Sequence, residues 1–89
     1  MAKQFLIYGR VQGVGFRYFT WKEAEKLGIK GSVRNRDDGS VEVIAQGTKA
    51  QLQLFEQWLR KGPRSAKVMQ ISVNDHQDIE TETFLVIRR

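Results

Sequence analysis

The sequence predicts an α+β fold: an antiparallel sheet with two helices on one of its faces. Segments of alternating polarity, typical of strands, are interspersed with two longer segments of helical periodicity. Their order along the chain is β-α-β-β-α-β, followed by a short terminal strand. This order is the split βαβ pattern of the ferredoxin-like fold, a two-layer sandwich.

The chain begins with a predicted strand, a loop and a helix. Residues 3–9 are rich in β-forming side chains, and residues 10–15 contain two glycines that favour a loop. Residues 16–27 are expected to form a helix that ends at Gly28, a residue typical of helix C-caps. The side chains expected to form its buried stripe are Phe16, Phe19, Ala24 and Leu27.

The middle of the chain predicts a β-hairpin. Residues 29–36 and 40–46 alternate in polarity, and Asp37-Asp38-Gly39 between them is typical of a tight turn. One face of the first strand presents Ile29, Gly31, Val33 and Asn35, and one face of the second presents Val41, Val43 and Ala45.

The last third of the chain predicts a second helix and two strands. Thr48 and Gln51 form a capping-box pattern at the start of the helix, and Gly62-Pro63 ends it. Its buried stripe is expected to be Leu52, Phe55 and Leu59. A strand over 66–74, with Met69, Ile71 and Val73 on one face, then precedes a polar loop over 75–82 and a final strand over 83–88.

Composition limits the class of protein. The 89 residues are expected to form one domain, 1–89, and no apolar run reaches the roughly 18 residues of a membrane span. The lack of cysteine excludes disulfides, thiolate metal sites and cysteine nucleophiles. We therefore expect a cytoplasmic monomer.

The net charge of +5 favours anionic partners without saying which. Phosphorylated metabolites, nucleic acid and acidic membranes all carry the required charge. The basic residues are scattered along the chain, which argues against a nucleic-acid-binding stripe.

The loop after the first strand has the composition of a phosphate site. Gly13 and Gly15 allow the backbone to approach a ligand and its N–H groups to converge on an anion. A helix begins directly afterwards, and Arg17 in its first turn can hold two phosphoryl oxygens. The dinucleotide fingerprint is absent, because Tyr18 stands where it needs a glycine. The P-loop pattern is absent as well, because the sequence contains no Gly-Lys-Ser or Gly-Lys-Thr. From these residues, a plain glycine-rich connection with a surface arginine is an equally good interpretation.

The predicted topology places a second segment opposite this loop. With a strand order of 4-1-3-2, the first and second strands are separated by the third, a distance of about 9–10 Å. Residues 9–17 and 35–39 are therefore expected to face one another at the same edge of the sheet.

Both segments resemble those of the acylphosphatase family. Tyr8 to Arg17, YGRVQGVGFR, is similar to the family signature G-x-V-Q-G-V-x-F-R. Gly31 to Val41, GSVRNRDDGSV, is similar to the family stretch G-x-V-x-N-x-x-D-G-x-V. The resemblance extends over nearly the whole chain, including the final strand.

The resemblance implies a hydrolase that acts on the acid anhydride of a small-molecule acyl phosphate. Arg17 would bind the phosphoryl group, and Asn35 would position the attacking water. The resemblance also implies that the reaction needs no metal or other cofactor. Backbone N–H groups would complete the phosphate site; they belong to Gln12, Gly13, Val14, Gly15, Phe16 and Arg17.

Other candidate residues have simpler structural interpretations. His76 is the sole histidine, and one imidazole in a polar loop is more often solvated than a metal ligand. Asp37 and Asp38 precede a glycine, which favours a turn over a catalytic carboxylate pair. Trp21 and Trp58 lie outside the main helical stripes and are expected to cover the helix edges.

Two alternative functions remain open. RNA-binding modules share this order of elements, but they stack bases on aromatic side chains of strands one and three. The third strand here, Val41-Glu42-Val43-Ile44, has no aromatic residue and carries an acid. A fused relative that handles carbamoyl phosphate within a larger maturation protein is the other alternative; the chain ends after its last strand, so a stand-alone enzyme is favoured.

Overall fold

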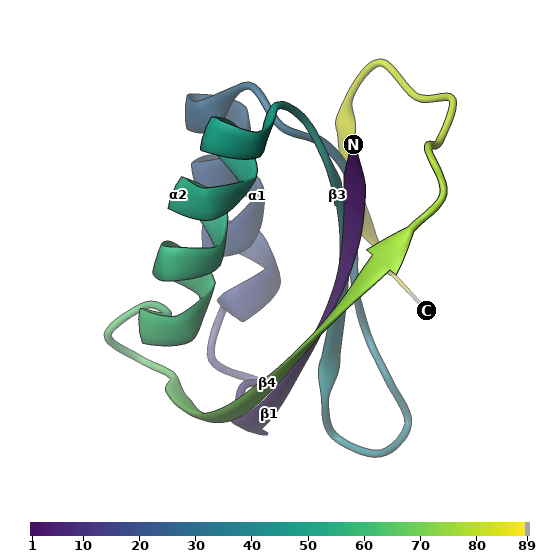
Figure 1. Ribbon diagram of the computed structural model, residues 1–89. Helices are drawn as coiled ribbons and strands as arrows, with labels where there is room; N and C mark the ends of the chain where they lie inside the picture. Colours follow the sequence, from purple (N-terminus) through teal and green to yellow (C-terminus); the bar gives the residue numbers. More distant parts are fainter. Residues whose placement is uncertain (89) are drawn as a thin grey trace.

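The computed structural model describes residues 1–88 and has the predicted order of elements (Figure 1). The strands and helices are β1 (Ala2–Arg10), α1 (Phe16–Leu27), β2 (Lys30–Asn35), β3 (Val41–Gln46), α2 (Lys49–Lys61), β4 (Lys67–His76) and β5 (Phe84–Ile87).

The strands form one sheet in the order β4-β1-β3-β2-β5. The first four pair antiparallel, as predicted, whereas β5 pairs in parallel with β2 and makes the sheet mixed. Val43 of β3 lies opposite Phe5 of β1 on one side and Val33 of β2 on the other. All three side chains are buried, so the register aligns the apolar positions of neighbouring strands on one face.

Both helices pack against this apolar face (Figure 1). Phe55 of α2 lies edge-on to Phe5 of β1 and to Phe84 of β5, with ring centroids 6.3 and 6.1 Å apart. The ferredoxin-like α+β fold predicted from the sequence is confirmed. No helix in residues 1–88 combines the length and the apolarity needed to cross a membrane.

The helix ends agree with their predicted caps. Gly28 adopts a left-handed conformation with φ of 75°, and the carbonyls of Ala24 and Glu25 are satisfied at this end. At the start of α2, Thr48 and Gln51 form the reciprocal hydrogen bonds of a capping box.

The buried stripe of α1 differs from the prediction at one position. Thr20 is fully buried, whereas Phe19 is 40% exposed. The stripe advances in steps of four residues through Phe16, Thr20 and Ala24, and Phe19 lies roughly 100° from its centre on the helix. The prediction that Phe19 belongs to the buried stripe is therefore wrong.

A bulge in β4 overturns the prediction that Met69 shares a face with Ile71 and Val73. Tyr8 pairs with Gln70 but Gly9 pairs with Val68, so Met69 is skipped in the register. Val68 packs against the core in its place, and Met69 is 68% exposed.

Glycine is required at the position opposite the bulge. A Cβ atom on Gly9 would lie 2.2 Å from the carbonyl oxygen of Lys67, and the φ of Gly9 is 133°. Strand β4 also continues to His76, beyond the predicted end of the strand.

The segment after β4 carries the chain from one edge of the sheet to the other. Its backbone is held at Ile79, which exchanges two hydrogen bonds of 2.7 and 3.0 Å with the Gln46 side chain at the end of β3. The chain then enters β5 beside β2, so the end of β5 comes close to α1 and to the loop after β1.

Candidate functional site

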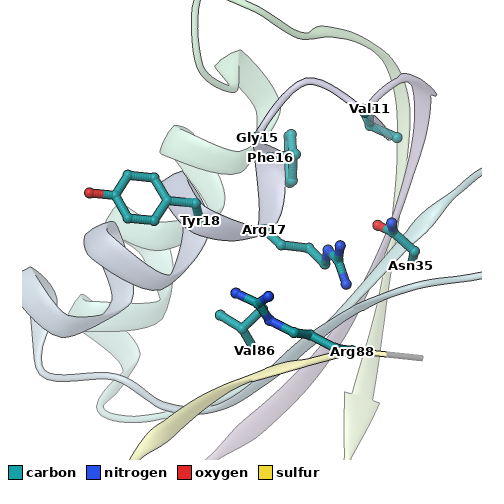
Figure 2. A pocket seen from close by; sticks show the side chains of 9 residues that line it. Val11, Gly15, Phe16, Arg17, Tyr18, Asn35, Val86 and Arg88 are labelled. Carbon is teal, nitrogen blue, oxygen red and sulfur yellow. The ribbon is translucent and has the colours of Figure 1, made fainter.

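A cavity of about 220 Å³ lies between the start of α1, the end of β2 and the end of β5 (Figure 2). Segments far apart in the sequence meet there. Its lining residues are Val11, Gly13, Gly15, Phe16, Arg17, Tyr18, Asn35, Val86 and Arg88.

The loop between β1 and α1 forms one wall of the cavity. Gly13 and Gly15 have φ values of 73° and 78°, in the left-handed region that favours glycine. A Cβ atom on Gly13 would meet nothing within 4 Å, so backbone conformation, and not space, favours glycine at this position.

The N–H groups of this loop are available to a ligand. In the described part of the chain, the backbone hydrogen bonds outside helices and strands include none donated by residues 12–17. No side chain caps the start of α1, and its first turn contains no acidic residue. Uncapped N–H groups and the positive end of a helix dipole together favour an anion at this position.

Arg17 reaches across the cavity from the first turn of α1. Its Nη1 atom donates a 2.9 Å hydrogen bond to the carbonyl oxygen of Ile87 at the end of β5. This contact orients the guanidinium group toward the cavity, where its remaining N–H groups can bind an anion.

Asn35 lies at the end of β2, across the cavity from the loop. In Figure 2 its side-chain amide and the Arg17 guanidinium group face the same opening. The two segments expected to face one another therefore meet at this cavity.

Gln12 connects the loop to the β2–β3 hairpin. Its Nε2 atom donates hydrogen bonds of 2.8 Å to the carbonyl oxygens of Arg36 and Ser40. The loop and the hairpin are thus held at a set distance by one side chain.

Asp38 stabilises the turn of the hairpin. Asp38 accepts hydrogen bonds from the hydroxyl and the backbone N–H of Ser40, which lower the pKa of this carboxyl group below its ordinary value. Gly39 completes the turn with a φ of 91°. Neither Asp37 nor Asp38 lines the cavity.

Some of the predicted site residues line the cavity and others do not. Gly13, Gly15, Phe16, Arg17 and Asn35 line the cavity, whereas Gln12 and Val14 do not.

Val14 packs against the core instead, and its carbonyl oxygen accepts a 2.6 Å hydrogen bond from Ser65. The predicted roles of Gln12 and Val14 concern their backbone N–H groups, and these roles stay predictions.

Four cavity residues were absent from the predicted site residues: Val11, Tyr18, Val86 and Arg88. Val86 and Arg88 reach the cavity because β5 pairs in parallel with β2, a pairing that no local pattern in the sequence indicates. Tyr18 follows Arg17 in the helix. Its side chain is exposed and does not belong to the apolar stripe predicted for α1, so the helical pattern did not indicate it.

The lining of the cavity is cationic. It contains two guanidinium groups, from Arg17 and Arg88, and no carboxylate among the residues that the structure describes. Such a lining favours an anionic ligand.

The remaining candidates lie away from the cavity. His76 ends β4, and its Nδ1 atom lies 2.7 Å from the carbonyl oxygen of Gln77. Within residues 1–88 there is no group of three or more acidic or histidine side chains placed to hold a metal ion.

The two tryptophans occupy the helix edges. Trp58 packs partly buried beside Phe16, with ring centroids 6.1 Å apart, and Trp21 lies 6.1 Å from Tyr18 on the outer side of α1.

Fold and cavity define an α+β protein of ferredoxin-like fold with a cationic cavity between a glycine loop, a helix start and a strand end. The family model for acylphosphatase matches residues 3–86. An acylphosphatase of Pasteurella multocida strain Pm70 is 53% identical over 88 residues, which are 99% of this chain and 98% of that protein.

Solved acylphosphatase structures have the same fold. The crystal structure of acylphosphatase from Bacillus subtilis superposes with a TM-score of 0.92 at 41% identity, covering 98% of each chain. An acylphosphatase structure from Coxiella burnetii also gives a TM-score of 0.92, at 31% identity, covering 97% of this chain and 90% of that one. The chain belongs to the acylphosphatase family, and the enzyme is a hydrolase.

Proposed function

We propose that this enzyme hydrolyses the carboxyl–phosphate bond of small-molecule acyl phosphates, releasing a carboxylate and inorganic phosphate without a metal ion. The observation that carries the proposal is the convergence of the glycine loop after β1, Arg17 and Asn35 on one cationic cavity. Each of these parts supplies one requirement of phosphoryl transfer.

The loop and Arg17 hold the phosphoryl group. Backbone N–H groups of residues 12–17 surround its oxygens, and the guanidinium group of Arg17 binds two of them in a fork. The phosphoryl transition state is loose and anionic, so that positioning and charge stabilisation supply most of the catalysis. Here the positive charge is provided by one arginine, the amide groups and the start of α1.

Asn35 positions the attacking water with its side-chain amide. The water oxygen forms a bond to phosphorus while the bond from phosphorus to the acyl oxygen breaks, and its electron pair leaves with the carboxylate. The conjugate acid of this leaving group has a pKa of about 4, so it departs without a general acid. A proton of the water passes to a phosphate oxygen of the substrate, because an asparagine side chain is too weak a base to retain it.

The RNA-binding alternative has less support. The outer face of β3 presents Glu42, which accepts hydrogen bonds from Gln4 of 2.7 Å and from Arg34 of 2.6 Å. An acidic group in the middle of this face repels a phosphate backbone.

Hydrolysis of benzoyl phosphate in the presence of a chelator tests the proposal. Arg17→Ala and Asn35→Ala are each expected to reduce kcat/KM, by about 10³-fold for Arg17→Ala, because interactions made with the transition state are lost. Arg60→Ala is the matched control: within residues 1–88, Arg60 pairs only with Glu56 on the surface of α2, and its removal leaves the activity unchanged. Full activity in both site variants, or loss of wild-type activity in the chelator, contradicts the proposal.

The pH–rate profile tests the proton transfer separately. If the substrate phosphate takes the proton, kcat/KM has no limb near neutral pH that belongs to an ionising enzyme group. A limb near pH 7 that persists across substrates of different phosphate pKa would show that an enzyme base takes part.

A further inference from the structure

Arg88 brings a second guanidinium group into the cavity. It follows directly after β5, and its side chain runs back alongside Val86, on the side of Arg17 away from Asn35 (Figure 2). No carboxylate in residues 1–88 forms a salt bridge with Arg88. Its backbone position is held by the preceding residue, because the carbonyl oxygen of Ile87 accepts the hydrogen bond from Arg17.

The geometry of phosphoryl transfer assigns the two sides of the cavity to different parts of the substrate. The attacking and leaving oxygens lie roughly in line through phosphorus. If Asn35 holds the water, the acyl group leaves on the opposite side of the phosphoryl group. Arg88 and Val86 lie on that side, so they adjoin the acyl half of the substrate.

We propose that Arg88 binds the acyl half and selects acyl phosphates whose acyl group carries a second anionic group, a carboxylate or a phosphate. This inference rests on the proposed function, from which the orientation of the substrate follows. The phosphoryl group meets the loop and Arg17, while Arg88 supplies a planar pair of donors for a further anion. Val86 offers apolar contact for the carbon chain between the two anions.

The experiment compares two substrates that differ in one remote charge, benzoyl phosphate and 4-carboxybenzoyl phosphate. The measured quantity is the ratio of kcat/KM for the charged substrate to that for the neutral one. It is determined for the wild type and for Arg88→Ala, Arg88→Lys and Arg88→Glu. Lys26→Ala is the control, because it removes the same charge from the far end of α1, where Lys26 lies in the last turn.

Arg88→Ala is expected to lower this ratio by on the order of 10-fold, the usual effect of losing one charge-assisted hydrogen bond. Arg88→Glu lowers it further, Arg88→Lys gives an intermediate value because an ammonium group lacks the planar fork, and Lys26→Ala leaves it unchanged. An unchanged ratio in Arg88→Ala overturns the proposal. An equal loss with both substrates also overturns it, since Arg88 would then act on the phosphoryl half.

A binding measurement separates this proposal from the proposed function. Benzoylphosphonate and 4-carboxybenzoylphosphonate keep the charges of the two substrates but contain no anhydride bond to hydrolyse. Calorimetric titration is expected to show tighter binding of the carboxylated compound to the wild type, and loss of that preference in Arg88→Ala. If the wild type binds both with this preference but hydrolyses neither substrate, the proposed function fails and the Arg88 site stands. If it hydrolyses benzoyl phosphate but shows no preference, only the Arg88 site fails.

Discussion

Glu42 shows how one charged side chain is held on the outer face of the sheet. Partial burial raises the pKa of its carboxyl group, but hydrogen bonds from Arg34 and Gln4 oppose this, and the net result is a lowered pKa. Because the folded state has the lower pKa, the ionised carboxylate stabilises the fold above the unfolded-state pKa of about 4.3. That contribution disappears as the pH falls through the folded-state pKa.

We therefore expect Glu42→Gln to destabilise the enzyme near neutral pH and to lose this effect in acid. The difference in urea midpoint from the wild type should be largest near pH 7 and should shrink below about pH 4. Urea unfolding from pH 3 to 7 measures it. Glu25→Gln removes the same charge from an exposed position of α1 and reports the effect of net charge. A difference for Glu42→Gln that stays constant across this range would contradict the stated role of its ionised carboxylate.

At the scale of elements, the site depends on how the loop after β1 is joined to the β2–β3 hairpin. Gln12 makes this connection through two carbonyl oxygens of the hairpin. The turn of this hairpin begins directly after Asn35, the last residue of β2, so Gln12 helps to set the distance from the loop to Asn35.

Gln12→Ala is expected to weaken both stability and turnover. The carbonyl groups of Arg36 and Ser40 each lose one donor and keep a backbone N–H donor, so the cost is that of two hydrogen bonds, about 1–3 kcal/mol of the free energy of unfolding. The activity should fall as well, because the loop and Asn35 are then free to move apart. Benzoyl phosphate kinetics and urea unfolding measure the two effects. Gln53→Ala, at an exposed position of α2, is the control, and unchanged kcat/KM in Gln12→Ala would show that the connection does not matter to the site.

At the scale of the whole molecule, the two layers share one core whose centre is aromatic. Phe55 of α2 contacts Phe5 of β1 and Phe84 of β5, which belong to separate parts of the sheet. The packing of α2 therefore ties β5, and with it Val86 and Arg88, to the rest of the fold.

Phe55→Ala is expected to lower the free energy of unfolding by about 3–5 kcal/mol, through lost apolar contact and the cavity left behind. This is a large share of the 5–15 kcal/mol typical of a small domain, so thermal and urea midpoints should fall strongly. Leu54→Ala is the matched control: Leu54 is the preceding residue of α2 and is 53% exposed. Similar losses in the two variants would contradict a core centred on Phe55.

Features that depend on near neighbours could be predicted from the sequence. The order of elements, the ends of α1 and the Thr48 capping box rest on contacts spanning a few residues. The two motifs around Arg17 and Asn35 also indicated the family, and the expected topology placed them at one edge of the sheet. The sequence by itself thus determined the fold class, the family and the two segments that meet at the cavity.

Features that depend on partners far away in the chain were decided by the tertiary structure. Which side of α1 is buried follows from its position against the sheet, and this places Thr20 inside and Phe19 outside. The bulge that turns Met69 outward exists only in the pairing of β4 with β1. Arg88 enters the cavity because β5 pairs in parallel with β2. Each of these outcomes comes from packing or strand register between distant segments, which local propensity does not encode.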